Sequence, residues 1–235
     1  MNHLEFQLRG VGDPRLAVHA TSPQPAWLWS IDGTRILWAN PVGASLFGAD
    51  NAAELAQRVL GPADSHKRQV AQLAGRLPPS GAIRLERLRG FGAALGALVT
   101  CGCARLDFAD GNHGILITVA EPIGRTMPLL ERLQRLVDGI DMPIASFSRD
   151  GRFVGASRAA RPLLGFRDLS EAGLDQARND ALKHGRVETP IGIGHLVLQR
   201  VGSGADVGLV ALIVPGDVTH PKPVAAAEPD RKSVV

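Results

Sequence analysis

The sequence predicts an α+β fold of two similar domains, because one pattern of residues occurs twice along the chain. Each copy has a short apolar strand, an Asp-Gly turn, a returning strand and a small polar residue that begins a helical turn. The copies lie at 25–48 and 143–165. Short helices and three more strand-like runs follow each copy. An internal repeat of this length indicates two domains in a row rather than one large domain.

The composition is that of an ordinary globular chain. With 235 residues, of which 45% are hydrophobic, it is long enough for two modest cores. The net charge is +3, but the 26 Lys and Arg residues are scattered, so no nucleic-acid partner is expected. The longest apolar stretch, 91–104, is interrupted by glycines and is too short to span a bilayer, and 1–9 lacks a signal-peptide core. We therefore expect a cytoplasmic protein with no membrane partner.

The first copy predicts a hairpin over the Asp-Gly pair at 32–33, with Trp27 and Trp29 on one face of its first strand. Asn40 followed by Pro41 predicts a helix start, because Asn caps free amide groups and Pro gives up a donor that has no partner there. Residues 1–24 are expected to be a lead-in in which prolines interrupt any long element. The further expected elements are a short helix led by Asn51, a helix over 64–77, and strands near 83–88, 97–106 and 115–120.

The second copy follows the same order in a shorter form. A helix is predicted over 127–140, between the copies, and a hairpin over 150–151. The remaining expected elements are a helix over 174–184 that Gly185 ends, and strands near 187, 195–201 and 207–214. The Pro- and Ala-rich stretch after 216 is typical of a flexible linker, which leads us to expect a truncated chain.

Taken together, the hairpin of 25–39, the runs 39–41 and 46–48, the helices and the three-stranded meander resemble a PAS domain. The second copy resembles a shorter PAS domain, with Ser157 where the first has Asn40. The stretch 19–48 is also similar to the amino-terminal sensory region of alphaproteobacterial-type PAS sensor histidine kinases.

This resemblance implies, for each domain, a five-stranded antiparallel sheet with short helices over one face, the two domains being joined by an amphipathic helix. PAS modules sense small ligands or redox state, or hold partners and dimers together. The shorter helical cover of the second copy leaves less room for a cofactor. The implied parts are a lead-in at 1–24, a first domain at 25–121, a connecting helix at 122–141, a second domain at 142–215, and a linker or tail at 216–235.

The function that the resemblance implies is a non-catalytic sensory and dimerisation region of a bacterial sensor histidine kinase. A kinase domain in cis would complete the two-component phosphorelay, and the inter-domain helix would relay the binding of a ligand or partner. The alternative is a free-standing PAS protein that binds a small molecule, haem being one candidate. An enzyme in its own right ranks lowest, because no nucleophile and base pair, metal quartet or phosphate loop can be assembled from the motifs.

Three sets of side chains are candidates for binding. The resemblance places His66 where haem-binding PAS domains carry their axial His, although a His in a first helical turn is more often structural. Trp27 and Trp29 are candidates for a ligand pocket or an exposed docking face, with packing on the sheet as the alternative. Cys101 and Cys103 lie on one face of a strand, and we interpret them as small buried hydrophobes rather than as a redox or metal pair.

The helix between the copies carries an apolar seam with spacings of four, three and four residues. The seam favours two hypotheses equally: it packs on the sheet of its own domain, or it forms a two-fold contact in a homodimer and carries signal between domains. Glu131, Arg132, Gln134 and Arg135 are expected on the opposite, polar side. The seam consists of Leu129, Leu133, Leu136 and Ile140.

Overall fold

The computed structural model describes residues 3–92, 97–121, 126–192 and 194–216, and these contain two five-stranded antiparallel sheets. The predicted α+β fold with two such sheets is therefore confirmed. The strand orders, β2-β1-β5-β4-β3 and β7-β6-β10-β9-β8, correspond strand for strand. Sheet 1 consists of β1 (Ala26–Trp29), β2 (Ile36–Ala39), β3 (Arg84–Arg89), β4 (Leu98–Asp107) and β5 (His113–Val119). Sheet 2 consists of β6 (Ile144–Ser148), β7 (Phe153–Ala156), β8 (Arg186–Ile191), β9 (Gly194–Val201) and β10 (Gly208–Pro215).

Both predicted Asp-Gly hairpins are present. Gly33 and Gly151 have φ of 68° and 92°, in the left-handed region that a side chain disfavours. Gly33 also lies so close to α5 that a Cβ there would be 2.5 Å from the Lys67 carbonyl oxygen. A glycine is therefore required at position 33, both by the backbone conformation of the turn and by its close packing on α5.

Three helices cover one face of sheet 1, which we call its inner face. They are α3 (Pro41–Leu46), α4 (Ala52–Ala56) and α5 (Ser65–Ala74). The helix predicted over 64–77 ends early, at Ala74, and a turn follows at 75–76. The core beneath these helices contains Trp27, Trp29, Ile36, Val70, Leu73, Cys101, Cys103, Ile115 and Ile117.

Sheet 2 has a thinner cover on its inner face. In the described part of this domain the cover is the 3-10 helix η1 (Arg161–Leu163) and α7 (Asp175–His184), which ends at Gly185 with φ of 91°. A second 3-10 helix, η2 (Gly204–Asp206), precedes β10. The inner core contains Ala145, Phe147, Leu169, Ala177, Ala181, Leu196, Leu198, Leu209, Ala211 and Ile213.

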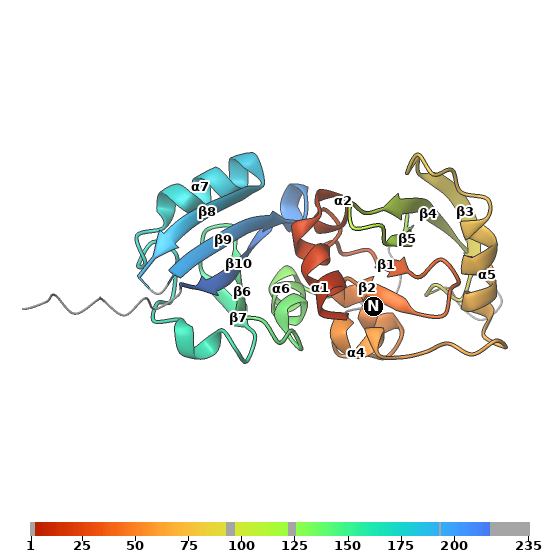
Figure 1. Cartoon of the computed structure of the whole chain (residues 1–235), viewed down its shortest axis with the longest axis horizontal. Coiled ribbons are helices and arrows are strands. Elements are labelled where there is room, and N and C mark those ends of the chain that lie inside the picture. Colours follow the sequence, from red (N-terminus) through yellow and green to blue (C-terminus); the bar gives the residue numbers. More distant parts are fainter. Residues whose placement is uncertain (1–2, 93–96, 122–125, 193, 217–235) are drawn as a thin grey trace, which may run out of the picture.

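The opposite, outer faces of the two sheets share one core. Figure 1 shows α1 (His3–Gly12) and α6 (Leu129–Val137) between the sheets, and α2 (Pro14–Ala17) follows α1 directly. Side chains of these helices and of both outer faces form a single buried cluster, which we call the shared core. It includes Phe6, Val11, Leu16, Leu28, Trp38, Leu106, Leu116, Leu133, Leu136, Ile144, Val201 and Val210.

The helix α1 lies in the stretch that we expected to be a lead-in. The prolines do not prevent it, because α1 ends at Gly12 and Pro14 occupies the first position of α2, where no amide donor is needed. Gly10 allows the helix to lie against sheet 1: a Cβ there would be 1.9 Å from Trp38 Nε1. No helix in the described ranges is long and apolar enough to cross a bilayer.

Candidate functional site

The joint between the two domains buries the charged side chain of Arg132 in α6, which is 5% exposed. Its Nη2 donates to Asp206 Oδ1 at 2.8 Å, and its Nη1 donates to the Thr21 carbonyl oxygen. Thr21 Oγ1 in turn donates to the Asp206 carbonyl oxygen. One guanidinium therefore connects the segment before β1, the helix α6 and the turn before β10. Our expectation that Arg132 lies on the polar side of its helix is wrong, because its guanidinium faces these two partners.

The segment that carries Thr21 is itself fixed by Asn40, which is completely buried. Asn40 Oδ1 accepts from the amides of Gly43 at 2.8 Å and Ala26 at 3.1 Å, and so caps α3 as predicted. Its Nδ2 donates to the carbonyl oxygens of Gln24 at 2.7 Å and His19 at 3.0 Å. The helix cap of domain 1 thus also holds the chain that enters the joint.

Ser157 occupies the matching position in domain 2. Its Oγ donates to the Met142 carbonyl oxygen at 2.6 Å and accepts from the amides of Ile144 and Ala160, each at 3.2 Å. The hydroxyl therefore ties the strand entry to the following turn, as the Asn amide does in domain 1. It has no second polar group with which to hold a more distant segment.

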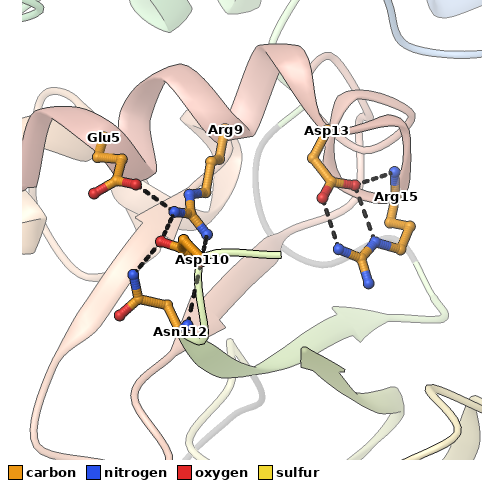
Figure 2. A network of polar contacts seen from close by, with 6 residues as sticks. All are labelled: Glu5, Arg9, Asp13, Arg15, Asp110 and Asn112. Atoms are coloured by element: carbon orange, nitrogen blue, oxygen red, sulfur yellow. Dashed lines mark hydrogen bonds and ion pairs between the residues drawn. The ribbon is translucent and has the colours of Figure 1, made fainter. Parts of the chain in front are cut away.

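A polar network fixes α1 to the β4–β5 hairpin of domain 1 (Figure 2). Arg9 forms ion pairs with Glu5 on its own helix and with Asp110 in the hairpin. The Arg9 guanidinium carbon also lies 4.7 Å from the ring centroid of Phe108. The hydrogen bond from Arg9 holds the pKa of Asp110 well below its usual range. Asp110 is therefore ionised, and α1 remains paired, over the whole neutral range.

The start of α2 makes a second connection to the same hairpin, through Arg15, whose pairing with Asp13 is drawn in Figure 2. Asp13 caps α2 and pairs with Arg15 at 2.7 Å, and this hydrogen bond lowers the pKa of Asp13. Arg15 Nη1 donates to the Asp107 carbonyl oxygen at 3.2 Å. Farther along the same segment, the Gly202 amide of domain 2 donates to the Ala17 carbonyl oxygen at 2.7 Å. The segment α1–α2 therefore contacts both domains.

The apolar seam of α6 belongs to the shared core. Leu133 is 0% exposed, Leu136 is 6% exposed and Ile140 is 4% exposed, while Leu129 packs on the cluster from its edge. A Cβ at Gly208 of β10 would lie 2.5 Å from Leu133 Cδ2, so the helix and the sheet are in close contact. Side chains of the same chain pack against the seam on all of its buried positions. The hypothesis that these residues face a second copy is therefore wrong, because a second copy has no access to them.

Trp27 and Trp29 are each 0% exposed and face the helices of domain 1. The hypothesis that Trp27 and Trp29 form an exposed docking face is therefore also wrong, since the register of β1 points both rings inward. Trp27 Nε1 donates to the Gly43 carbonyl oxygen at 2.9 Å, and Phe47 and Phe91 pack edge-on against both indole rings. Aromatic rings thus fill the space between the sheet and the helices.

His66 completes this aromatic cluster. Its ring is stacked on Trp29 at an interplanar angle of 18°. Its Nδ1 lies 3.0 Å from Asp64 Oδ1, and its Nε2 lies 2.9 Å from the Gly90 carbonyl oxygen. An axial haem ligand needs one ring nitrogen with a lone pair directed at iron, but both nitrogens here face acceptors of the chain itself. The residues around His66 do not fit a haem.

Cys101 and Cys103 lie on the inner face of β4, and both are completely buried. Burial raises the pKa of each thiol to about 12. Protonated thiols are poor nucleophiles and poor metal ligands, so these side chains pack as small hydrophobes. In the ranges that the structure describes, no three His, Cys, Asp or Glu side chains are grouped so that they would hold a metal ion.

Comparisons with known proteins agree with this architecture. A family model described as a PAS domain matches residues 20–78 and again residues 131–190, together just over half of the chain. No curated protein sequence matches the chain.

Likeness to solved structures is weak. An extracellular ligand binding receptor from Desulfohalobium retbaense is 12% identical with a TM-score of 0.27, and the match covers 89% of this chain but only 37% of that one. The extracellular domain of the putative histidine kinase rpHK1S-Z16 is 16% identical with a TM-score of 0.28, covering 88% and 82%. A domain of a putative sensory box/GGDEF family protein from Vibrio parahaemolyticus is 9% identical with a TM-score of 0.27, covering 92% and 80%. TM-scores this low do not establish a common arrangement of the whole chain.

Proposed function

Because the chain belongs to the PAS domain family and contains two copies of the domain, we propose that it is a non-catalytic sensory and dimerisation region of a bacterial sensor histidine kinase. In this proposal the chain is cytoplasmic, and a kinase domain in cis carries the phosphorelay. The observation that supports it best is the shared core, which packs the outer faces of both sheets on α1 and α6.

The shared core supports a relay for a physical reason. Domains that are joined by a linker alone move independently, whereas packed apolar layers shift as units when one of them is displaced. The helix α6 contacts β6 and β7 of domain 2 and also α3 of domain 1. A change at the helices of domain 1 therefore has a direct mechanical route to sheet 2, and Arg132 lies on that route.

The proposal is tested by joining the chain to a histidine kinase core and measuring autophosphorylation from labelled ATP. We expect the fused chain to change the rate, and Arg132→Gln to alter that change. The matched control is Arg152→Gln, whose side chain is 82% exposed and pairs with Asp150 rather than with Asp206. Equal rates with and without the chain would contradict the proposal, as would ATP turnover by the chain alone.

Dimerisation is part of the proposal and needs a surface other than the seam. Light scattering coupled to size exclusion measures it directly on the full chain. A monomer at tens of micromolar would remove dimerisation from the proposed function and leave the relay to be judged by the kinase assay.

The second candidate function is a free-standing protein that binds a small molecule. The observation that favours it is a pair of cavities between α1 and domain 2, one apolar and one with basic residues in its wall. A haem-binding version is not supported, because both ring nitrogens of His66 are engaged.

A further inference from the structure

An apolar recess of about 160 Å³ lies between α1 and the outer face of sheet 2. A dry apolar cavity of about this size holds a benzene-sized molecule. The recess therefore has room for one small aromatic ring or a short alkyl group. The apolar side chains in its wall are Leu8, Val11, Ile144, Val197, Val210 and Leu212.

The recess adjoins a larger groove of about 470 Å³ at the ends of α7, β8 and β9. Gly12, Arg186 and Gln199 line both spaces, so the two lie side by side at these residues. His184 and Arg200 line the groove as well. Among the described residues that line either space, none is acidic.

The Arg186 guanidinium of the groove is exposed and only weakly paired. Arg186 is 59% exposed on its side chain, and its nearest carboxylate oxygen, Glu188 Oε2, lies 4.0 Å away. Arg200 follows Gln199 on β9, so its side chain points to the inner face of the sheet, where its Nη1 donates to the Leu182 carbonyl oxygen of α7 at 2.7 Å. A planar carboxylate matches the planar guanidinium fork of an Arg side chain with two parallel hydrogen bonds.

We propose that the recess and the groove form one binding site for a small amphiphilic carboxylate. The aromatic or alkyl group lies in the recess, and the carboxylate lies at Arg186, whose strand partner Gln199 also lines both spaces. The site is outside the sheet of domain 2, on the side away from its inner core, and one wall of it is α1.

Because the site lies between the two domains, a bound ligand would affect the signal relay. This part of the inference rests on the proposed function. The wall formed by α1 is fixed to domain 1 through Arg9 and Asp110, while the remaining walls belong to domain 2. A ligand that touches both walls holds the domains together. Binding is measured without a kinase, so its failure and a failure of kinase coupling are distinguishable.

The test is calorimetric titration of the full chain with phenylacetate and, as a neutral analogue of the same shape, phenylacetamide. We expect phenylacetate to bind and phenylacetamide to bind at least about tenfold more weakly, because the charge-assisted hydrogen bonds are lost. Arg186→Gln should weaken phenylacetate binding by about tenfold. The control Arg152→Gln should leave it unchanged.

The apolar part is tested separately by Leu8→Phe, which fills the recess from a partly exposed position of α1. With circular dichroism unchanged, this variant should lose binding of phenylacetate. Absence of binding by phenylacetate and by octanoate at millimolar concentration would overturn the proposal, as would equal affinity for the amide. Tighter binding of phenyl phosphate than of phenylacetate would overturn the assignment of a carboxylate. If Leu8→Phe fails to fold, the surface variant Arg186→Gln still decides the outcome.

Discussion

Arg132 Nη2 lies 2.8 Å from Asp206 Oδ1, although the two residues belong to a helix and a turn that are 74 positions apart in the chain. The Arg side chain is 6% exposed and the Asp side chain 31% exposed, so the cation is buried while its partner still reaches water. Arg132 Nε has no hydrogen-bond partner among the described residues. Burying a guanidinium that is not fully satisfied costs free energy, and the bonds to Asp206 and Thr21 offset part of that cost.

Replacing Arg132 by Ala should lower the free energy of unfolding by about 2 to 4 kcal/mol, because Asp206 and the Thr21 carbonyl oxygen lose their shared donor. Urea denaturation measures the change. The matched control is Arg135→Ala on the same helix, whose pair with Glu131 is partly exposed and should contribute below about 1 kcal/mol. Equal effects of the two substitutions would show that Arg132 is not a structural connection.

Leu133→Ala should destabilise the chain by about 2 to 5 kcal/mol, since it removes a completely buried side chain from the shared core. Leu130→Ala is the control, because this neighbour on α6 is 58% exposed and should change stability by less than about 0.5 kcal/mol. Denaturation and size exclusion are measured together. Dissociation of a dimer without loss of stability would mean that the seam faces a partner after all.

Asn40→Ala should destabilise the chain more than Ser157→Ala, because the amide fixes both the helix cap and the chain segment before β1. We expect about 2 to 4 kcal/mol for Asn40→Ala and about 1 to 2 kcal/mol for Ser157→Ala. Thermal unfolding of the two variants provides the comparison. A larger loss for Ser157→Ala would contradict the view that domain 1 holds the joint.

Acidification should weaken the attachment of α1. The pKa of Asp110 is lowered in the folded chain, mainly by Arg9, so its contribution to stability is complete above the unfolded-state pKa of about 3.9 and is lost as the pH falls through the lower, folded value. The difference in stability between the wild-type chain and Asp110→Asn should therefore be largest at neutral pH and should shrink below about pH 4. A difference that does not depend on pH between 7 and 2 would exclude the ion pair as its cause.

The strands and turns could be predicted from the sequence because their signals are local. The Asp-Gly pairs predict the hairpins, and Asn40-Pro41 and Gly185 predict a helix start and a helix end, since each sets the backbone conformation at its own position. Every predicted strand is present with its bounds shifted by at most a few residues.

The joint could not be predicted in the same way, because its elements depend on distant contacts. The helix α1 has only ten residues and contains two glycines near its end, so it would be marginal alone and is stabilised by burial of Phe6 and Val11 between the sheets. Alternation along β1 separates Trp27 and Trp29 from Leu28, but it does not determine which face meets the helices. The burial of Arg132 could have been anticipated from the sequence. It lies three residues after Leu129 and next to Leu133, within a buried helical face that is wider than the seam.

The shared core also determines how the chain responds to truncation and how it unfolds. A truncation between the two repeats would uncover the outer face of one sheet, and the fragment would have to place leucines, valines and an indole ring in water. We therefore expect neither half to fold on its own, even though the two sheets have matching strand orders. Although the topology occurs twice, we expect calorimetric unfolding to give one cooperative transition rather than two.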